Sequence, residues 1–170
     1  MPNTYTLISS NVLTSSAASV TFSAIPATFT DLVLRCSTRD TNAAQWVSAF
    51  LQVNSTTSSY SYTYIRGNGS TAVSQRDTAQ ANFFVANNNG SGSTSSTFAN
   101  FEIYIPNYAG ATNKVISSNA VGEDNSTSPV YLAAIAGLLS NTTAVTSLTM
   151  VASTAFSTNS SFYLYGIKNS

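Results

Sequence analysis

Residues 97–105 read Thr97-Phe98-Ala99-Asn100-Phe101-Glu102-Ile103-Tyr104-Ile105, and this stretch decides the fold class. Phe101, Ile103 and Ile105 alternate with more polar neighbours, which is the period of two expected of a β-strand with one buried face. Pro106 follows, and a proline is typical of a strand end because it cannot donate a hydrogen bond within a sheet. We predict a strand here, with its Phe101 face turned inward.

The same pattern recurs along the chain. Short β-rich runs separated by polar turns come roughly every ten residues, and no segment longer than a few residues has the 3.6-residue period of an amphipathic helix. The predicted strands cover residues 4–9, 19–22, 31–37, 46–53, 60–66, 82–86, 97–105, 114–121, 130–138, 145–152 and 162–168. This spacing predicts an all-β fold, an antiparallel β-sandwich of about ten strands.

Two stretches carry more specific predictions. Residues 130–138 are almost continuously apolar, which predicts a strand covered on both sides, with a short helix through its alanines as the alternative. Residues 87–96 are rich in Gly, Ser and Asn and predict an exposed loop. No linker or repeat divides the sequence, so we expect one domain over residues 1–170, with residues 1–10 as an N-terminal arm or edge strand.

The sequence carries very little charge. Only 7% of its residues are charged, against about 25% in a typical soluble domain. Ser (29), Thr (23) and Asn (17) supply the polar surface instead, and six basic residues balance six acidic ones. A neutral exterior suits dense assembly. Dispersed Lys and Arg argue against nucleic-acid binding, and the absence of an apolar run of about 20 residues argues against a transmembrane helix.

The chemistry of catalysis is largely missing. The chain has no histidine, which removes His-based nucleophile activation and metal sites. Cys36 lies within a predicted strand and is expected to be a buried thiol. A carboxylate pair such as Glu102 and Glu123 remains the one route to glycoside hydrolysis, and residues 122–125 resemble no standard Ca²⁺ loop. We predict no enzyme activity, no cofactor and no metal site.

Tyrosines form the most distinctive pattern. Tyr60, Tyr62 and Tyr64 share one face of a predicted strand. Three interpretations stay open: the rings cap the sheet of their own domain, they contact a neighbouring subunit, or they stack on sugar rings. The N-terminal segment with Tyr5 and Leu7 could add a strand to a partner. The residues predicted for an interface are Tyr5, Leu7, Tyr60, Tyr62 and Tyr64.

Several segments, taken in order, resemble a group of small β-sandwich proteins from tailed-bacteriophage structural modules. They are Tyr5-Thr-Leu-Ile-Ser-Ser10, Ser19-Val-Thr-Phe-Ser-Ala-Ile-Pro26, Phe29-Thr-Asp-Leu-Val-Leu-Arg35, Tyr60-Ser-Tyr-Thr-Tyr-Ile-Arg-Gly-Asn-Gly69 and Phe162-Tyr-Leu-Tyr-Gly-Ile167. Each piece is generic β sequence, whereas their order and spacing from Tyr5 to Ile167 are more specific.

This resemblance implies a jelly-roll-like virion protein, either a capsid decoration (cement) protein or part of a head or tail fibre. Such proteins are commonly homotrimers, so the implied partners are the major capsid protein and copies of this chain. We expect a decoration protein on the capsid surface, synthesised in the host cytoplasm because the N-terminus carries no secretory signal. The alternative is a fibre adhesin that binds a host-surface glycan through exposed Tyr, Trp46 and loop Asn residues.

Overall fold

A computed structural model describes residues 4–127 and 130–168, and all regular elements in these residues are β-strands. They are, in chain order, β1 (Tyr5–Val12), β2 (Ala17–Phe22), β3 (Asp31–Thr38), β4 (Trp46–Val53), β5 (Tyr60–Gly67), β6 (Ala72–Gln80), β7 (Phe83–Asn89), β8 (Ala99–Pro106), β9 (Lys114–Val121), β10 (Leu132–Leu139), β11 (Leu148–Phe156) and β12 (Ser161–Ile167). Within these ranges no helix has the length and apolar character needed to cross a membrane.

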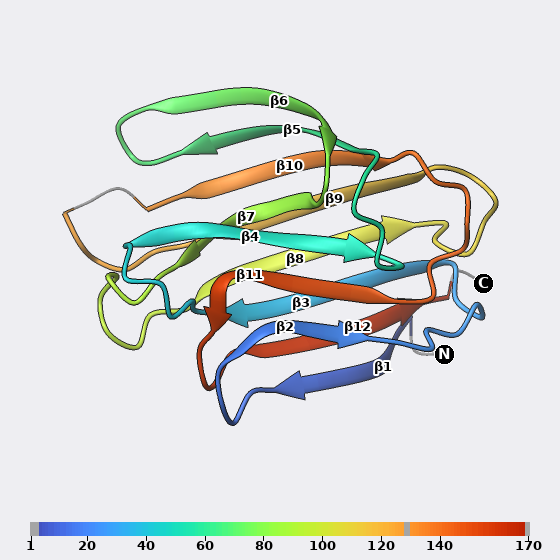
Figure 1. The fold of residues 1–170 in the computed structure, drawn as a ribbon, viewed down its shortest axis with the longest axis horizontal. Coiled ribbons are helices and arrows are strands. Elements are labelled where there is room, and N and C mark those ends of the chain that lie inside the picture. The colour runs from blue at the N-terminus through green and yellow to red at the C-terminus, as the bar shows by residue number, and fades with distance from the viewer. Residues whose placement is uncertain (1–3, 128–129, 169–170) are drawn as a thin grey trace.

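The strands form two facing sheets (Figure 1). One has eight strands in the order β1-β12-β3-β8-β9-β10-β5-β6, and the other has four in the order β2-β11-β4-β7. Each ladder in both sheets is antiparallel. The predicted antiparallel β-sandwich is confirmed.

The chain winds between the sheets as it does in a jelly roll. β5 pairs with β6, β4 with β7 and β3 with β8, so a long hairpin is folded over and its successive pairs fall in alternating sheets. The β2–β11 and β1–β12 pairs continue this nesting toward the chain ends. The β9–β10 hairpin widens the larger sheet between β8 and β5. β1 pairs on one side only and is therefore an edge strand.

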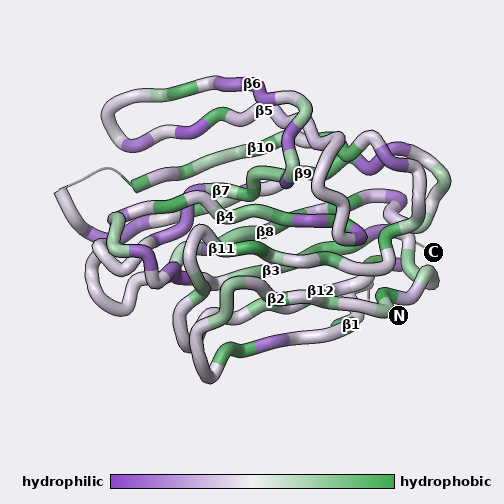
Figure 2. The backbone as a smooth tube through the Cα atoms, in the orientation of Figure 1, coloured by the Kyte–Doolittle hydropathy of each residue, from purple (hydrophilic) through white to green (hydrophobic). Residues whose placement is uncertain are grey.

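Alternation along the strands builds the core between the sheets. Phe101, Ile103 and Ile105 of β8 are buried, and so are the four residues of β4 from Val47 to Val53 that share its inward face. Figure 2 shows hydrophobic positions recurring along strands of both sheets. The inward Phe101 face predicted for residues 97–105 is confirmed, and Cys36 is the buried free thiol that its place in β3 indicates.

The two sheets approach each other closely where β7 crosses β10. Gly137 of β10 faces the ring of Phe83, and a Cβ atom at Gly137 would lie only 2.1 Å from Cε2 of that ring. Phe83 is fully buried, and its ring meets the Tyr62 ring edge-on with 6.1 Å between centroids. Glycine suits residue 137 because the Phe83 ring occupies the space that a side chain there would need.

The prediction of an exposed loop over residues 87–96 is wrong for its first residues and correct for most of the rest, because residues 91, 92 and 94–96 are exposed and lie outside the strands. Asn87, Asn88 and Asn89 belong to β7 and are buried. The side-chain amide of each has at least one hydrogen-bond partner. The Asn88 side-chain oxygen, for example, accepts a bond of 3.0 Å from the Thr38 hydroxyl. Polar side chains can occupy an interior position when they are paired in this way.

Arg39 fixes the remainder of that segment. Its guanidinium donates to the backbone carbonyls of residues 91, 93, 94 and 97 and to the Thr97 hydroxyl, over distances of 2.8–3.2 Å. The segment that follows β7 is therefore attached to the residues that follow β3, and Ser93 within it is buried.

Two further predictions need correction. β6 was not predicted, because its sequence is polar and it lies at the sheet edge with most of its side chains exposed. β10 is a strand and not a helix, but it is covered on one side only. Ala133, Ile135 and Leu139 are buried, whereas Leu132 is 65% exposed on the opposite face.

Candidate functional site

One face of the larger sheet carries most of the exposed apolar side chains. In the described residues, nine large hydrophobic side chains are exposed. Strand register places seven of them on the face of the eight-stranded sheet that points away from the four-stranded sheet, which we call the apolar outer face. They are Tyr5, Leu7, Val12, Ile65, Val115, Val121 and Leu132. The other two, Trp46 and Val73, lie elsewhere.

The apolar outer face is hollowed over β5, β9 and β10. A shallow groove of about 610 Å³ is bordered by Ile65, Val121 and Leu132, with Asn100, Glu102 and Asn119 among its polar residues. Leu132 lies opposite Val121 in one ladder, and Ala134 lies opposite Ile65 in the next. Because directly opposed residues project from the same face, these side chains form a continuous apolar surface.

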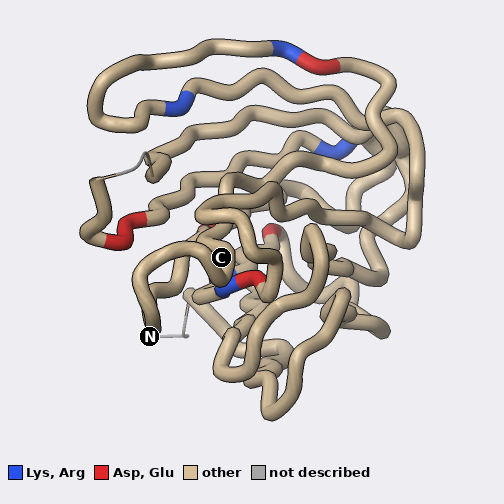
Figure 3. The backbone as a smooth tube through the Cα atoms, turned by 60° about the vertical axis from the view of Figure 1, so that its left-hand side comes forward, with Lys and Arg blue, Asp and Glu red and all other residues tan. Residues whose placement is uncertain are grey.

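Charge on this face is sparse, as Figure 3 shows for the whole backbone. Arg35 and Glu102 are neighbours across the β3–β8 ladder, and their side chains form an ion pair of 2.8 Å. The Arg35 guanidinium also lies 5.5 Å from the centre of the Tyr5 ring. Tyr163 and Asn119 lie directly beside this pair, and the exposed apolar residues lie further out, on β1 on one side and on β9, β10 and β5 on the other.

The predicted interface residues are divided by the fold. Tyr5 and Leu7 are 47% and 51% exposed on the apolar outer face. Tyr60, Tyr62 and Tyr64 are buried and point toward the other sheet. The Tyr60 hydroxyl accepts a bond of 2.8 Å from the Val53 amide, and the Tyr64 hydroxyl donates to Gln75 at 2.8 Å. These three rings therefore pack within their own domain and offer no surface for a subunit contact.

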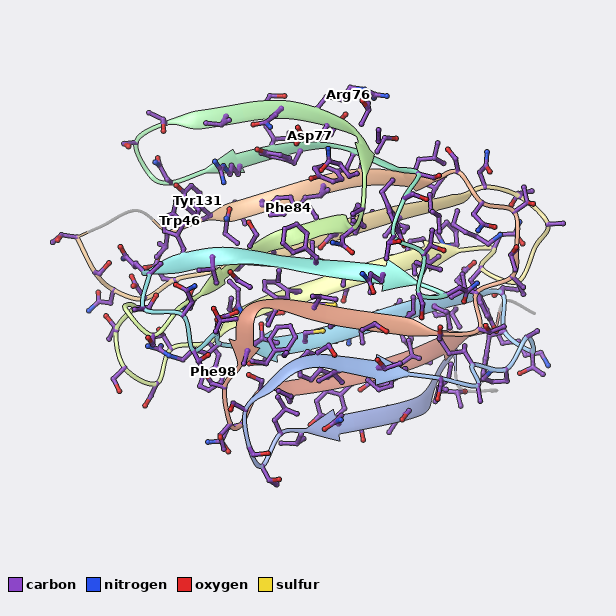
Figure 4. The ribbon with its side chains drawn as sticks, in the orientation of Figure 1. Trp46, Arg76, Asp77, Phe84, Phe98 and Tyr131 are labelled. Carbon is purple, nitrogen blue, oxygen red and sulfur yellow. The ribbon has the colours of Figure 1, made fainter. Side chains whose placement is uncertain are left out.

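A second candidate site lies where β5 and β6 extend past β7. The outward residues of β4 and β7 face the inner face of β5 and β6 across a small hollow of about 150 Å³, which we call the Arg66 cleft. It is lined by Ser48, Phe50, Tyr62, Tyr64, Arg66, Asp77 and Phe84. Figure 4 shows Phe84 over the smaller sheet and Asp77 at the β5–β6 edge, with Trp46 and Tyr131 together at the other end.

Arg66 occupies the centre of an aromatic cluster at that end. Its guanidinium carbon lies 4.7 Å from the ring centre of Tyr131, 5.5 Å from that of Tyr64 and 5.7 Å from that of Trp46. Trp46 and Tyr131 meet edge-on with centroids 5.0 Å apart. A guanidinium over aromatic rings is a favourable arrangement, so this cluster joins β4, β5 and the segment before β10.

Several polar groups in the Arg66 cleft have spare hydrogen-bonding capacity. Arg66 donates from Nη1 to the Asn87 side-chain oxygen at 3.1 Å. Its Nε and the Asn87 side-chain nitrogen are buried and have no acceptor within the described ranges. Each carboxylate oxygen of Asp77 accepts a bond of 3.0 Å from the side-chain nitrogen of Gln75. Burial, followed by the charge of Asp77, raises the pKa of Tyr62, so its hydroxyl stays protonated at neutral pH.

The carboxylates considered for catalysis lie in separate surroundings. Glu102 belongs to the ion pair on the apolar outer face, while Glu123 accepts hydrogen bonds from the backbone amides of Asp124 and Asn125 in its own loop. Asp124 is buried and accepts a bond of 3.0 Å from the Ser126 amide. Residues 4–127 and 130–168 contain no group of three His, Cys, Asp or Glu side chains placed to hold a metal.

Comparison with known proteins adds little to this picture. No protein-family model matches the chain, and no curated protein matches it. Among solved structures it is similar to the CBM2 module of the evolved Dit of Lactobacillus casei BL23 phage J-1, with 11% identity and a TM-score of 0.21. The match covers 89% of this chain and 69% of the other. A similarity of this degree carries no argument about function.

Sequence reasoning did not identify the Arg66 cleft. Arg66, Trp46 and Tyr131 come from three distant parts of the chain, and nothing in their spacing brings them together. Trp46 was considered only as an exposed ligand contact of the alternative adhesin. The exposed side of β10 could have been found from the small residues Ala134 and Ala136, which share a face with Leu132.

Proposed function

We propose that this chain is a structural protein of a bacteriophage particle, specifically a capsid decoration protein that docks on the shell through its apolar outer face. In this role the chain is a binding module, and we propose no catalytic activity for it. The observation that carries the proposal is the gathering of seven exposed hydrophobic side chains on one face of one sheet. The bacteriophage context comes from the resemblance described for residues 5–167.

Physical chemistry supports a docking role for this face. Single exposed hydrophobic residues are common, but a set that borders a groove, as Ile65, Val121 and Leu132 do, marks an interaction surface. Leu132 is 65% exposed and Ile65 is 60% exposed. Full burial of a leucine or isoleucine is worth about 1.5–3 kcal/mol, so each has roughly 1–2 kcal/mol left to contribute to docking.

The neutral surface fits the same role. Arg35 and Glu102 satisfy each other, so covering the apolar outer face leaves no unpaired charge at its centre. The outward face of the smaller sheet is different, because hydroxyl groups such as those of Thr21 and Thr149, 2.9 Å apart, lie on it. Docking through the larger sheet would leave this polar face toward solvent.

A sedimentation experiment with purified shells tests the proposal. Particles assembled without this protein are mixed with the wild-type chain, with Ile65→Asp, or with Ser19→Asp as a control on an exposed strand position of the smaller sheet. We expect the wild type and Ser19→Asp to sediment with the shells and to raise their resistance to heat. Ile65→Asp should bind at least about tenfold more weakly, since docking would bury an unpaired carboxylate.

Two results would contradict the proposal. One is a wild-type chain that does not sediment with shells. The other is Ile65→Asp binding as tightly as Ser19→Asp while both remain folded. The alternative function, a fibre domain that binds a host-surface glycan, would use the Arg66 cleft instead.

A further inference from the structure

The Arg66 cleft combines exposed ring surface with hydrogen-bonding groups. Trp46 is 37% exposed and Tyr131 is half-buried beside it. Trp46 and Ser48 lie two residues apart on β4 and so project from the same face, which continues the ring surface into the hollow. A sugar ring presents an apolar C–H face and a rim of hydroxyl groups, and this combination suits such a site.

The unsatisfied polar groups indicate what a ligand must offer. Asn87 is 4% exposed and lies opposite Ser48 across the β4–β7 ladder, so its side chain projects from the face of β4 and β7 that lines the cleft. Its nitrogen and Arg66 Nε are buried donors without an acceptor among the described residues. Asp77 is an acceptor on the opposite wall. Different hydroxyl groups of a saccharide can accept from the first two and donate to the third.

Charge and size narrow the ligand class. Arg66 and Asp77 both line the cleft and their formal charges cancel, so neither an anionic nor a cationic ligand gains from the local charge. The hollow of about 150 Å³ is smaller than the roughly 300–1,000 Å³ of pockets that enclose drug-sized molecules. The hollow has space for one small sugar ring, with the rest of a longer saccharide outside it.

We infer that the Arg66 cleft is a binding site for a neutral saccharide, with one sugar ring in the hollow beside Arg66 and Asp77 and the adjoining part of the saccharide against the Trp46–Tyr131 pair at the other end. The site is formed by the outward faces of β4 and β7 and the inner face of β5 and β6. It is therefore separate from the apolar outer face, and a docked chain would keep the cleft free. The inference does not rest on the proposed docking function.

The single tryptophan of the chain provides a direct test. Trp46 is that residue, so intrinsic tryptophan fluorescence reports on the cleft alone. Purified full-length chain is first applied to an array of neutral and acidic glycans. It is then titrated with millimolar glucose, galactose, rhamnose, N-acetylglucosamine and, as the acidic probe, N-acetylneuraminic acid. We expect a saturable change of fluorescence with at least one neutral sugar and none with the acidic one.

Matched variants separate a binding role from a structural one. Asp77 and Arg76 are neighbours on exposed β6, and Figure 4 shows both at that edge. Arg76 lies opposite Thr63 on the other face, so Arg76→Ala is the control. Asp77→Ala should weaken saccharide binding about tenfold or more, because it removes a charged acceptor. Arg76→Ala and the docking variant Ile65→Asp should leave it unchanged.

The inference is overturned if no neutral sugar changes the fluorescence and no neutral glycan is retained on the array. It is also overturned if the acidic probe binds better than every neutral sugar, or if Asp77→Ala and Arg76→Ala bind alike. Saccharide binding is measured by fluorescence and shell docking by sedimentation, and Ile65→Asp is tested in both, so failure of one is seen separately from failure of the other.

Discussion

A methyl group at Gly137 is expected to destabilise the fold. Its Cβ would lie 2.1 Å from Cε2 and 2.5 Å from Cδ2 of Phe83, well inside contact distance. The Phe83 ring is fully buried and packed edge-on against Tyr62, so it has no free space to enter. Either the ring must leave its rotamer or β7 must move away from β10.

Two opposing effects set the magnitude. Overpacking a tight core costs about 1–3 kcal/mol, whereas alanine restricts the unfolded chain and favours a strand by about 0.5–1 kcal/mol relative to glycine. At a distance of 2.1 Å the steric cost is at its upper end. We expect Gly137→Ala to lower the free energy of unfolding by about 2–2.5 kcal/mol, which for a domain of this size lowers Tm by about 4–10 °C.

Urea denaturation of four variants measures this effect and its cause. Gly67→Ala is the control, because a Cβ there would meet its nearest neighbour, the Thr71 carbonyl oxygen, at 3.9 Å. It should not destabilise the fold, and a gain of up to about 1 kcal/mol is expected because alanine replaces glycine in a strand. Phe83→Leu is combined with Gly137→Ala, and the penalty of the alanine should shrink by at least about 0.5 kcal/mol in that background. A Gly137→Ala variant as stable as wild type, or a penalty that Phe83→Leu leaves unchanged, would refute the reasoning.

Three further predictions concern polar groups in the interior. Asp40 is fully buried, and its carboxylate accepts bonds of 2.8, 3.0 and 3.3 Å from the backbone amides of residues 42, 153 and 154. Asp40→Ala should therefore lower the free energy of unfolding, measured by urea denaturation, by about 3 kcal/mol or more, and a loss below about 1 kcal/mol would contradict this. Arg39→Met should expose residues 91–97 to limited proteolysis, whereas unchanged cleavage rates would show that the guanidinium does not hold this segment. Burial raises the pKa of Cys36 and of Tyr60. In the unfolded chain the thiol loses its proton above about pH 8.5 and the phenol above about pH 10, whereas the folded state keeps both protons at these pH values. Stability should therefore fall as the pH rises through these values, and Cys36→Ala should remove the earlier decline. A flat profile up to about pH 10 would count against the Cys36 assignment, and a flat profile up to about pH 11 would count against both.

Most of the strands could be predicted from the sequence because burial on one face imposes a period of two. β8 and β4 both show this period clearly, and the sequence identifies the inward face of β8 correctly. β6 could not be found this way. It is an edge strand with little to bury, and backbone pairing with β5 holds it in place without an apolar pattern.

Long-range pairing explains the remaining errors. Asn87 to Asn89 look like loop residues, but they are buried because Thr38, Arg66 and Thr97 supply hydrogen-bond partners from other parts of the chain. The apolar run of β10 gave no indication that one of its faces would be left uncovered. That depends on the four-stranded sheet covering one side of the larger sheet only. The apolar outer face and the Arg66 cleft both arise from this difference in size between the sheets.

The most direct measurement is a cryo-electron microscopy map of the intact particle that contains this protein. The account predicts density for the chain on the capsid shell, with Ile65, Val121 and Leu132 against the shell protein and the mouth of the Arg66 cleft open to solution. Density on an appendage, or on the shell with this face bare to solvent, would contradict it.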